Sequence, residues 1–259
     1  MAIPVSATTS HSRAVEVLMQ HVSLTYKDAN DALFIDLNLT LPAGEWTCLL
    51  GKSGCGKTTL LRQLAGLNED RVNWHGSLAT SDNKPLFERI AYMAQQDLLL
   101  PWLSVMDNVC LSHRFGSSPS PQDQDKAVRL LQAVGLETYA TAMPDQLSGG
   151  MRQRVALART LMQDKPLVLM DEPFSALDAV TRHKLQTLSA ELLKDRTVLL
   201  ITHDPQEALR LGHNIYIMTG KPAKLIELDT PTSPPPRQFD AQMANHQQTI
   251  IDQLEQDYG

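Results

Sequence analysis

A glycine-rich run early in the chain has the residue types and spacing to hold a chain of phosphates. Glycines allow the backbone to wrap around an anion with its N–H groups pointing inward. Lys57 has the charge and reach to bind the outer phosphates, and the Thr58 hydroxyl is a ligand for Mg²⁺. The run fits G-x-x-x-x-G-K-[ST] at every fixed position, so we predict a nucleoside triphosphate site. Its residues are Gly51, Lys52, Ser53, Gly54, Cys55, Gly56, Lys57, Thr58 and Thr59.

The sequence on either side of this run supports the phosphate site. An apolar stretch at residues 45–50 predicts a strand that ends at Gly51, and helical spacing runs from Gly56 to about Leu67. The N-terminus of a helix carries partial positive charge, which favours a phosphate. The alternative is a glycine-rich turn before an unrelated helix, and the strand–loop–helix context disfavours it.

Two adjacent carboxylates follow a second apolar stretch. Residues 167–170 predict a buried strand, and Asp171 and Glu172 come directly after it. In an open parallel sheet, ligands bind beyond the carboxyl ends of the strands. We expect Asp171 to hold Mg²⁺ through water, and Glu172 to polarise the attacking water as a general base. Two acids alone could equally cap a turn, but beside a phosphate loop they indicate hydrolysis of ATP.

A third motif carries a resemblance to a known family. Residues 147–154 read LSGGMRQR, which resembles the signature LSGGxxQR of the ATP-binding cassette (ABC) ATPases. Two glycines at a helix start weaken the helix, but they let an anion approach the backbone N–H groups. The resemblance implies nucleotide contacts from Ser148, Gly149, Gly150 and Gln153. The alternative is that Ser148 is a plain N-cap.

The resemblance covers residues 15–220 and assigns further roles. Tyr26 matches the aromatic residue that stacks on adenine, although a lone aromatic on a strand usually packs in a core. Gln95 matches the glutamine that senses Mg²⁺ and water, with Gln96 as the alternative register. Residues 175–178 match the D-loop, and His203 matches the switch histidine near the γ-phosphate.

These matches imply two cofactors, ATP and Mg²⁺, and a set of site residues. The residues implied in catalysis are Lys57, Gln95, Glu172 and His203. Those implied in holding the metal are Thr58, Gln95 and Asp171. In the family, ATP lies between the phosphate loop of one subunit and the signature of another. Because this chain has one of each, the resemblance implies a homodimer with two composite sites.

One segment narrows the resemblance to a branch of importers. The run from Leu99 to Val105, with Asn108 and Val109, resembles ATPases of importers for nitrate, sulfonates, taurine and thiamine-related pyrimidines. It overlaps the stretch from Leu98 to Leu103, where we expect permease subunits to dock. In the family, membrane subunits dock just after Gln95, so Trp102 is a candidate anchor for a permease. The alternative is that Trp102 packs inside the protein. A solute-binding protein is implied only indirectly.

Two rival classes are disfavoured by the same motifs. ABC-type ATPases of DNA maintenance separate the phosphate loop and the signature by a long coiled coil, and no heptad run lies between Lys57 and Ser148. A non-hydrolysing regulatory subunit would show damage at Lys57, Glu172 or His203, and all three are intact. We therefore expect an ATPase that drives transport.

The order of predicted elements indicates an α/β fold of the P-loop NTPase type. Alternating strands and helices imply a parallel sheet, preceded by antiparallel strands in residues 15–41. We expect a flexible tail at residues 1–13, an ATPase domain at 14–229 with a helical sub-lobe at about 97–152, and a Pro-rich linker with a helical tail at 230–259. That last tail could be a docking helix or a frayed surface segment, and we expect the frayed segment because short isolated helices are marginal.

Composition limits where the protein is expected to act and which partners it is expected to bind. A net charge of -6 argues against a nucleic-acid partner. No apolar run approaches the roughly 18 residues that span a bilayer, and the N-terminus lacks the pattern of a secretory signal. We expect a peripheral subunit at the cytoplasmic face of the inner membrane, with Cys48, Cys55 and Cys110 reduced. Cys55, beside Lys57, is predicted to be an accessible, reactive thiol.

Overall fold

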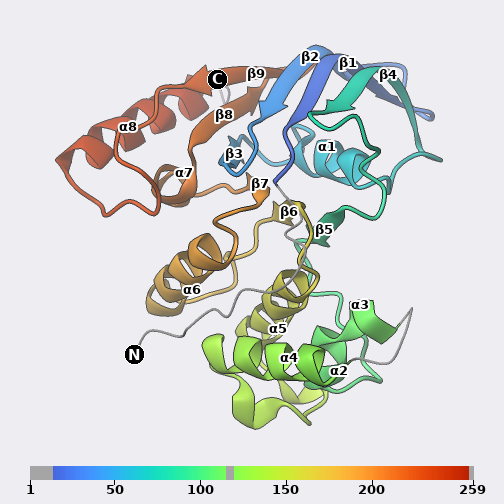
Figure 1. Cartoon of the computed structure of the whole chain (residues 1–259). Helices are drawn as coiled ribbons and strands as arrows, with labels where there is room; N and C mark the ends of the chain where they lie inside the picture. Colours follow the sequence, from blue (N-terminus) through green and yellow to red (C-terminus); the bar gives the residue numbers. More distant parts are fainter. Residues whose placement is uncertain (1–13, 115–119, 257–259) are drawn as a thin grey trace.

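The chain folds around two β-sheets, as seen in a computed structural model that describes residues 14–114 and 120–256. The predicted tail at residues 1–13 lies outside the described residues. The smaller sheet is antiparallel, with strand order β2-β1-β4, and Figure 1 shows it at one end of the molecule. Its strands are β1 (Val17–Tyr26), β2 (Ala32–Leu41) and β4 (Val72–Thr80).

The larger sheet has six strands in the order β5-β6-β7-β3-β8-β9. All neighbouring strands run parallel except the pair β8 and β9, which is antiparallel. The predicted α/β class, with a parallel sheet and an antiparallel N-terminal part, is therefore confirmed. The strands are β3 (Trp46–Leu50), β5 (Ile90–Met93), β6 (Leu167–Asp171), β7 (Thr197–Ile201), β8 (Asn214–Thr219) and β9 (Lys224–Leu228).

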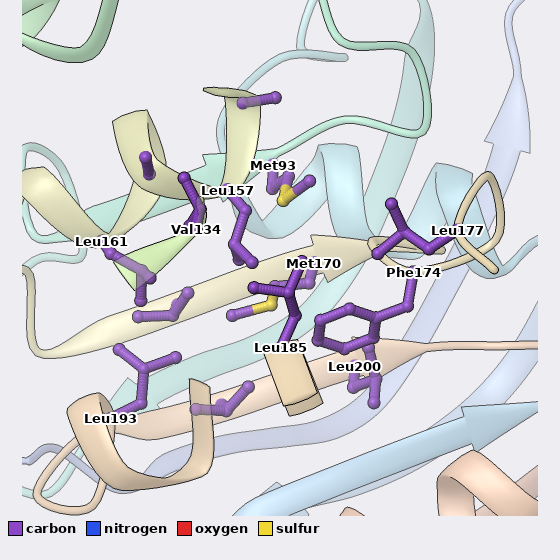
Figure 2. Close-up of a cluster of buried hydrophobic side chains, with 14 of the residues drawn as sticks. Met93, Val134, Leu157, Leu161, Met170, Phe174, Leu177, Leu185, Leu193 and Leu200 are labelled. Atoms are coloured by element: carbon purple, nitrogen blue, oxygen red, sulfur yellow. The ribbon is translucent and has the colours of Figure 1, made fainter. Parts of the chain in front are cut away.

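The central strands β3, β6 and β7 are buried at every position because both faces of the sheet are covered. Side chains alternate between the two faces of a strand. Val168 and Met170 accordingly belong to one buried cluster, and Leu167 and Leu169 belong to the other. Figure 2 shows the first cluster, in which Leu157 of the helix α5 (Gly149–Met162) lies over Met170. A continuous apolar run is the expected sequence of such a doubly covered strand.

The helices fall into those that cover the sheets and those that gather at one end. Figure 1 shows α2 to α5 together, away from the antiparallel sheet. Among the described residues, five helices begin at a side-chain N-cap, for example Ser120 with Asp123 in a capping box. The helices are α1 (Lys57–Leu64), α2 (Val105–Val109), α3 (Leu111–Arg114), α4 (Pro121–Ala133), α5 (Gly149–Met162), α6 (Ala179–Leu192), α7 (Pro205–Leu211) and α8 (Ala241–Gln256).

The C-terminal segment differs from the prediction. The expectation of a frayed surface segment is wrong, because α8 packs on α7 and buries Met243 and Ile250 to 2% exposure each. Burying each such side chain contributes about 1.5–3 kcal/mol, and this packing stabilises a helix that would be marginal in isolation. Within the described residues, no helix is long and apolar enough to cross a membrane.

Candidate nucleotide-binding site

The order of the parallel strands brings the predicted motifs to one edge of the sheet. Strands β5, β6, β7 and β3 are consecutive neighbours, so their carboxyl ends lie side by side. Gln95 follows β5, Asp171 ends β6, His203 follows β7, and the phosphate loop follows β3. Ligands of open parallel sheets bind at this edge. Motifs far apart in the sequence therefore meet at one place.

The backbone of the phosphate loop requires glycine at particular positions. Gly51 has φ 145°, and a Cβ there would collide with the carbonyl oxygen of Met218. Gly56 is the N-cap of α1 with φ 113°, in the left-handed region that other residues rarely adopt. Lys57 is buried, and its Nζ donates to the carbonyl oxygens of Gly51 at 2.7 Å and Lys52 at 2.9 Å. The loop therefore curls around the lysine that carries its positive charge.

A cavity of about 320 Å³ lies against this loop. At one side of it, the Tyr26 hydroxyl lies 2.6 Å from Oγ1 of Thr59, so the tyrosine ring is tied to the loop. Tyr26 also packs partly against a buried cluster, as the core interpretation of this residue expects. The cavity is lined by Tyr26, Leu33, Ser53, Gly54, Gly56, Lys57, Thr58, Thr59, Gln95 and Glu172.

Glu172 contacts two other residues that the sequence predicts for the site. Its Oε2 atom lies 3.3 Å from the donating Nε2 of Gln95 and 3.1 Å from Nδ1 of His203. The contact is made by Gln95, in the predicted register, and not by Gln96. Glu172 has φ 50°, an uncommon conformation for a non-glycine residue that often marks a functional site. This cluster places a carboxylate beside the phosphate loop, where a general base is needed.

Asp171 has the properties of a ligand for a hydrated cation. It is 2% exposed, and burial raises its pKa while a hydrogen bond from Thr58 opposes that rise. Among the described residues, its Oδ2 atom has no hydrogen-bond partner. Mg²⁺ is usually held by one or two protein oxygens together with the phosphates of the substrate. The carboxylate of Asp171 and the hydroxyl of Thr58 fit that donor set.

The signature residues stand apart from this cavity. Ser148, Gly149 and Gly150 begin α5 and do not line it, and Ser148 Oγ accepts a hydrogen bond from the N–H of Met151 at 3.3 Å. The N-cap interpretation of Ser148 therefore describes its local role. Gln153 is buried, and its Nε2 donates to the carbonyl oxygen of Pro173 at 3.1 Å. The signature helix thus holds the loop that follows Glu172.

The segment after Gln95 presents its tryptophan to solvent. Trp102 is 69% exposed, so the interpretation of Trp102 as a core residue is wrong. The loop is shaped by buried Asn108, whose side chain accepts from the N–H of Leu100 at 2.8 Å and donates to the carbonyl oxygen of Leu103 at 3.0 Å. Leu99 packs inward from the same loop. The hydrogen bonds of buried Asn108 therefore fix the shape of a loop whose tryptophan side chain is exposed.

The prediction of an accessible Cys55 thiol is wrong. Cys48, Cys55 and Cys110 are all buried. The Sγ atom of Cys55 lies 3.7 Å from Nζ of Lys57, so the predicted neighbourhood is present but closed to solvent. Gly51 packs directly over this sulfur.

Arg182, which no motif in the sequence predicted, links two loops of the site. Arg182 donates from Nε to the carbonyl oxygen of Phe174 at 3.3 Å and from Nη2 to that of Leu177 at 2.9 Å. Its Nη1 lies 3.7 Å from Oδ2 of Asp204, the residue after His203. Arg182 therefore joins the loop after Glu172 to the segment that holds His203 and Asp204. Its position four residues after Asp178, one turn into the following helix, is a signal that could have found it.

Comparisons with known proteins agree with this geometry. A family model described as ABC transporter matches residues 34–175. An aliphatic sulfonates import ATP-binding protein of Xanthomonas axonopodis pv. citri is 42% identical over 222 residues, covering 85% of this chain and 88% of that protein. A taurine import ATP-binding protein of Pelagibacter ubique is 43% identical over 195 residues, covering 73% of this chain and 72% of that protein.

Solved structures of ATP-binding cassettes are also similar to this chain. A dimeric ATP-binding cassette in a post-hydrolysis state, bound to ADP and phosphate, aligns with a TM-score of 0.72 and 30% sequence identity. The alignment covers 86% of this chain and all of that one. The resemblance inferred from the phosphate loop, the acids and the signature is confirmed: the chain belongs to the ABC transporter family.

Proposed function

We propose that this chain is the ATP-hydrolysing subunit of an importer for small sulfonates. It acts as a homodimer on permease subunits, as a peripheral protein at the cytoplasmic face of the inner membrane. The observation that carries the proposal is the contact of Glu172 with both Gln95 and His203 beside the phosphate loop. The choice of solute follows the names of the sulfonate and taurine relatives.

ATP binds along the cavity between Tyr26 and Glu172. The loop N–H groups and the positive end of α1 hold the phosphates, and Lys57 supplies a charge that turns from the loop carbonyls to the outer phosphates. Tyr26, tied to Thr59, provides a ring for the adenine. Tyr26, the residues of the phosphate loop and Glu172 all line this one cavity, so it offers a partner to the adenine, to the phosphates and to the attacking water.

Hydrolysis depends on positioning and charge and needs no covalent intermediate. Glu172 accepts the proton of the attacking water, while Gln95 and His203 hold its carboxylate in place. Thr58 and Asp171, with Gln95 lining the same cavity as Thr58, would hold Mg²⁺, which when bound would supply positive charge to the phosphates. The protein groups therefore orient the water and the phosphate chain against each other.

The exposed signature supports the dimer. Ser148 and Gly149 are exposed, and Gly149 and Gly150 leave backbone N–H groups at the start of α5 open to an anion. These residues do not line the cavity of their own chain, so they are available to the nucleotide of a second copy. The γ-phosphate then bridges two surfaces, and its loss on hydrolysis opens the dimer.

An exposed apolar surface supports permease docking. Two apolar surfaces are candidates. The first is the loop with the exposed side chains of Leu98 and Trp102. The second is a groove of about 510 Å³ between the end of α1 and the strands β4 and β5. Phe87, at the edge of this groove, is 81% exposed. Exposed apolar patches of this kind mark interaction sites, and aromatic residues are common anchors. The apolar and aromatic residues that line the groove include Leu67, Trp74, Leu78, Phe87, Ile90 and Tyr92.

Both surfaces are connected to the catalytic residues. Strand β5 begins at the groove, and its chain reaches Gln95 two residues after its end. Asp97 and Leu98 are held by the signature helix, because Arg159 donates to their carbonyl oxygens and Arg152 Nε lies 3.0 Å from Asp97 Oδ2. A permease that moves this loop therefore moves both Gln95 and α5.

Transport measurements test the proposal. Deletion of the gene should abolish growth on taurine or an alkanesulfonate as sole sulfur source and leave growth on sulfate unchanged. Complementation with the parent chain should restore growth, and the Glu172→Gln variant should not. Restored growth with Glu172→Gln would contradict the catalytic assignment. Unchanged sulfonate uptake after deletion would contradict the solute and leave the ATPase assignment to be judged by hydrolysis of purified protein.

A further inference from the structure

The C-terminal segment lies beyond the residues that the family model matches, and it covers the helix that follows His203. Figure 1 shows α8 beside α7, far from the helices α2 to α5. Met243 and Ile250 of α8 belong to the same buried cluster as Leu209 and Leu211 of α7. The segment is therefore an integral part of the structure around α7.

A buried arginine joins this segment to the C-terminal end of α7. Arg237 is 5% exposed, and its Nη1 donates to the carbonyl oxygens of Leu209 and Gly212, each at 2.7 Å. Its remaining nitrogens donate to the carbonyl oxygens of Ser233 and Pro231 at 2.6 Å and 3.0 Å. The last carbonyls of a helix lack partners within the helix and carry partial negative charge. Arg237 satisfies them and fixes the Pro-rich linker at the same time.

Further bonds hold α7 at both of its ends. The backbone N–H of Arg237 donates to the carbonyl oxygen of Arg210, and Arg210 Nη1 donates back to that of Arg237 at 2.7 Å. In the first turn of α7, Gln206 Nε2 donates to Oε1 of Gln247 on α8 at 3.2 Å. The helix is therefore attached to the C-terminal segment at both of its ends.

The other end of α7 leads directly to the catalytic cluster. His203 precedes Asp204, the N-cap whose Oδ1 accepts from the N–H groups of Gln206 and Glu207. Because α7 has only seven residues, a shift of its C-terminal end moves its N-terminal end as well. His203 Nδ1, which lies 3.1 Å from Glu172 Oε2, then moves relative to the proposed base.

We propose that the C-terminal segment, residues 230–256, is a brace for α7, and that Arg237 is a positioning residue for ATP hydrolysis. Arg237 acts through α7 on His203 and does not contact the nucleotide. The proposal rests on the switch role given to His203 above. It adds a part of the chain outside the ATPase motifs to the machinery that sets the turnover rate.

The test compares Arg237→Met in two backgrounds of the full chain. In the parent, Arg237→Met should lower kcat about tenfold with the KM for ATP unchanged, because small misplacements near a reacting centre can lower rates by up to about 10². In a His203→Gln background, measured by single-turnover hydrolysis, the same change should lower the rate no further. Arg237→Lys keeps the charge but has fewer donors, so it should restore part of kcat.

The matched control is Asp82→Asn, which removes the ion pair of Asp82 with Arg89, an interaction at 2.7 Å outside the nucleotide site. It should leave kcat unchanged. An unchanged kcat in Arg237→Met, or an equal loss in both backgrounds, would overturn the brace. A parent-like rate in His203→Gln alone would overturn the switch role and the brace together. If Arg237→Met does not fold, Arg237→Lys and Gln247→Ala serve in the same two-background comparison.

Discussion

Nδ1 of His203 and Nε2 of Gln95 approach the same oxygen of Glu172, at 3.1 Å and 3.3 Å. These two residues follow β7 and β5, the strands on either side of β6. Each connects Glu172 to a different surface: Gln95 to the exposed loop with Trp102, and His203 to α7. A movement at either surface therefore reaches the proposed base directly.

Replacing Glu172 by Gln should remove turnover and preserve ATP binding. The amide keeps the shape of the side chain but cannot accept a proton from water, so kcat should fall by about 10²–10⁴. Steady-state hydrolysis gives the rate, and light scattering should reveal a stable dimer in the presence of ATP. Hydrolysis at the parent rate would show that another group is the base.

Replacing Lys57 by Ala should weaken the binding of ATP. Nζ of Lys57 is the charge inside the phosphate loop, bonded to the carbonyl oxygens of Gly51 and Lys52. Its removal leaves the triphosphate with fewer positive partners, so the Kd for ATP should rise by at least about tenfold, the loss of about 1.4 kcal/mol. Titration with a fluorescent ATP analogue measures it. Unaltered affinity would contradict the assigned role.

Trp102→Ala and Leu99→Ala form a matched pair from one loop. Trp102 is exposed, so its loss should leave stability and the ATPase rate of the isolated chain unchanged while weakening assembly with the permease. Leu99 is buried, so its truncation should lower the free energy of unfolding by about 2–5 kcal/mol. Urea unfolding and co-purification distinguish them. If the Trp102→Ala variant binds the permease as well as the parent does, the assignment of Trp102 to the docking site is wrong.

The cysteines should react slowly with an alkylating reagent in the native protein. All three are buried, and burial raises the pKa of Cys48 far above its ordinary range. Labelling should become fast only after unfolding in denaturant. Mass spectrometry of the labelled peptides measures each site. Rapid native labelling of Cys55 would show that the phosphate loop opens to solvent in solution.

Glu207 should make stability depend on pH. Burial raises its pKa from 4.5 to about 7, against hydrogen bonds from Thr202 and Gln186. Between these values the folded protein retains a proton that the unfolded chain has lost, so the free energy of unfolding falls as pH rises through this window. Glu207→Gln should remove this fall and stabilise the protein above about pH 7 by up to about 3 kcal/mol, at roughly 1.4 kcal/mol per pKa unit.

Urea unfolding of the parent and Glu207→Gln at about pH 5 and about pH 8 measures the difference. The difference in the free energy of unfolding between the two proteins should increase as the pH rises. An equal difference at both values would show that the Glu207 carboxyl titrates normally in the folded state.

The sequence by itself determined the phosphate loop, the two acids at the end of β6 and the family. These signals are local: the pattern from Gly51 to Thr58 and the apolar run before Asp171 each lie in one short segment. The rule that parallel strands end at one edge then brings them together. Helix α5 was equally readable, because Ser148 is an N-cap at its start.

Only the tertiary structure decided which side chains are exposed. Trp102 stands in an apolar run yet is exposed, and Cys55 stands in a loop of glycines and polar residues yet is buried, because burial depends on residues remote in the chain. Strand β4 was not predicted, since its side chains are mostly exposed and lack an apolar alternation. The packing of α8 and the bonds of Arg237 depend on α7, a partner that no spacing within the tail reveals.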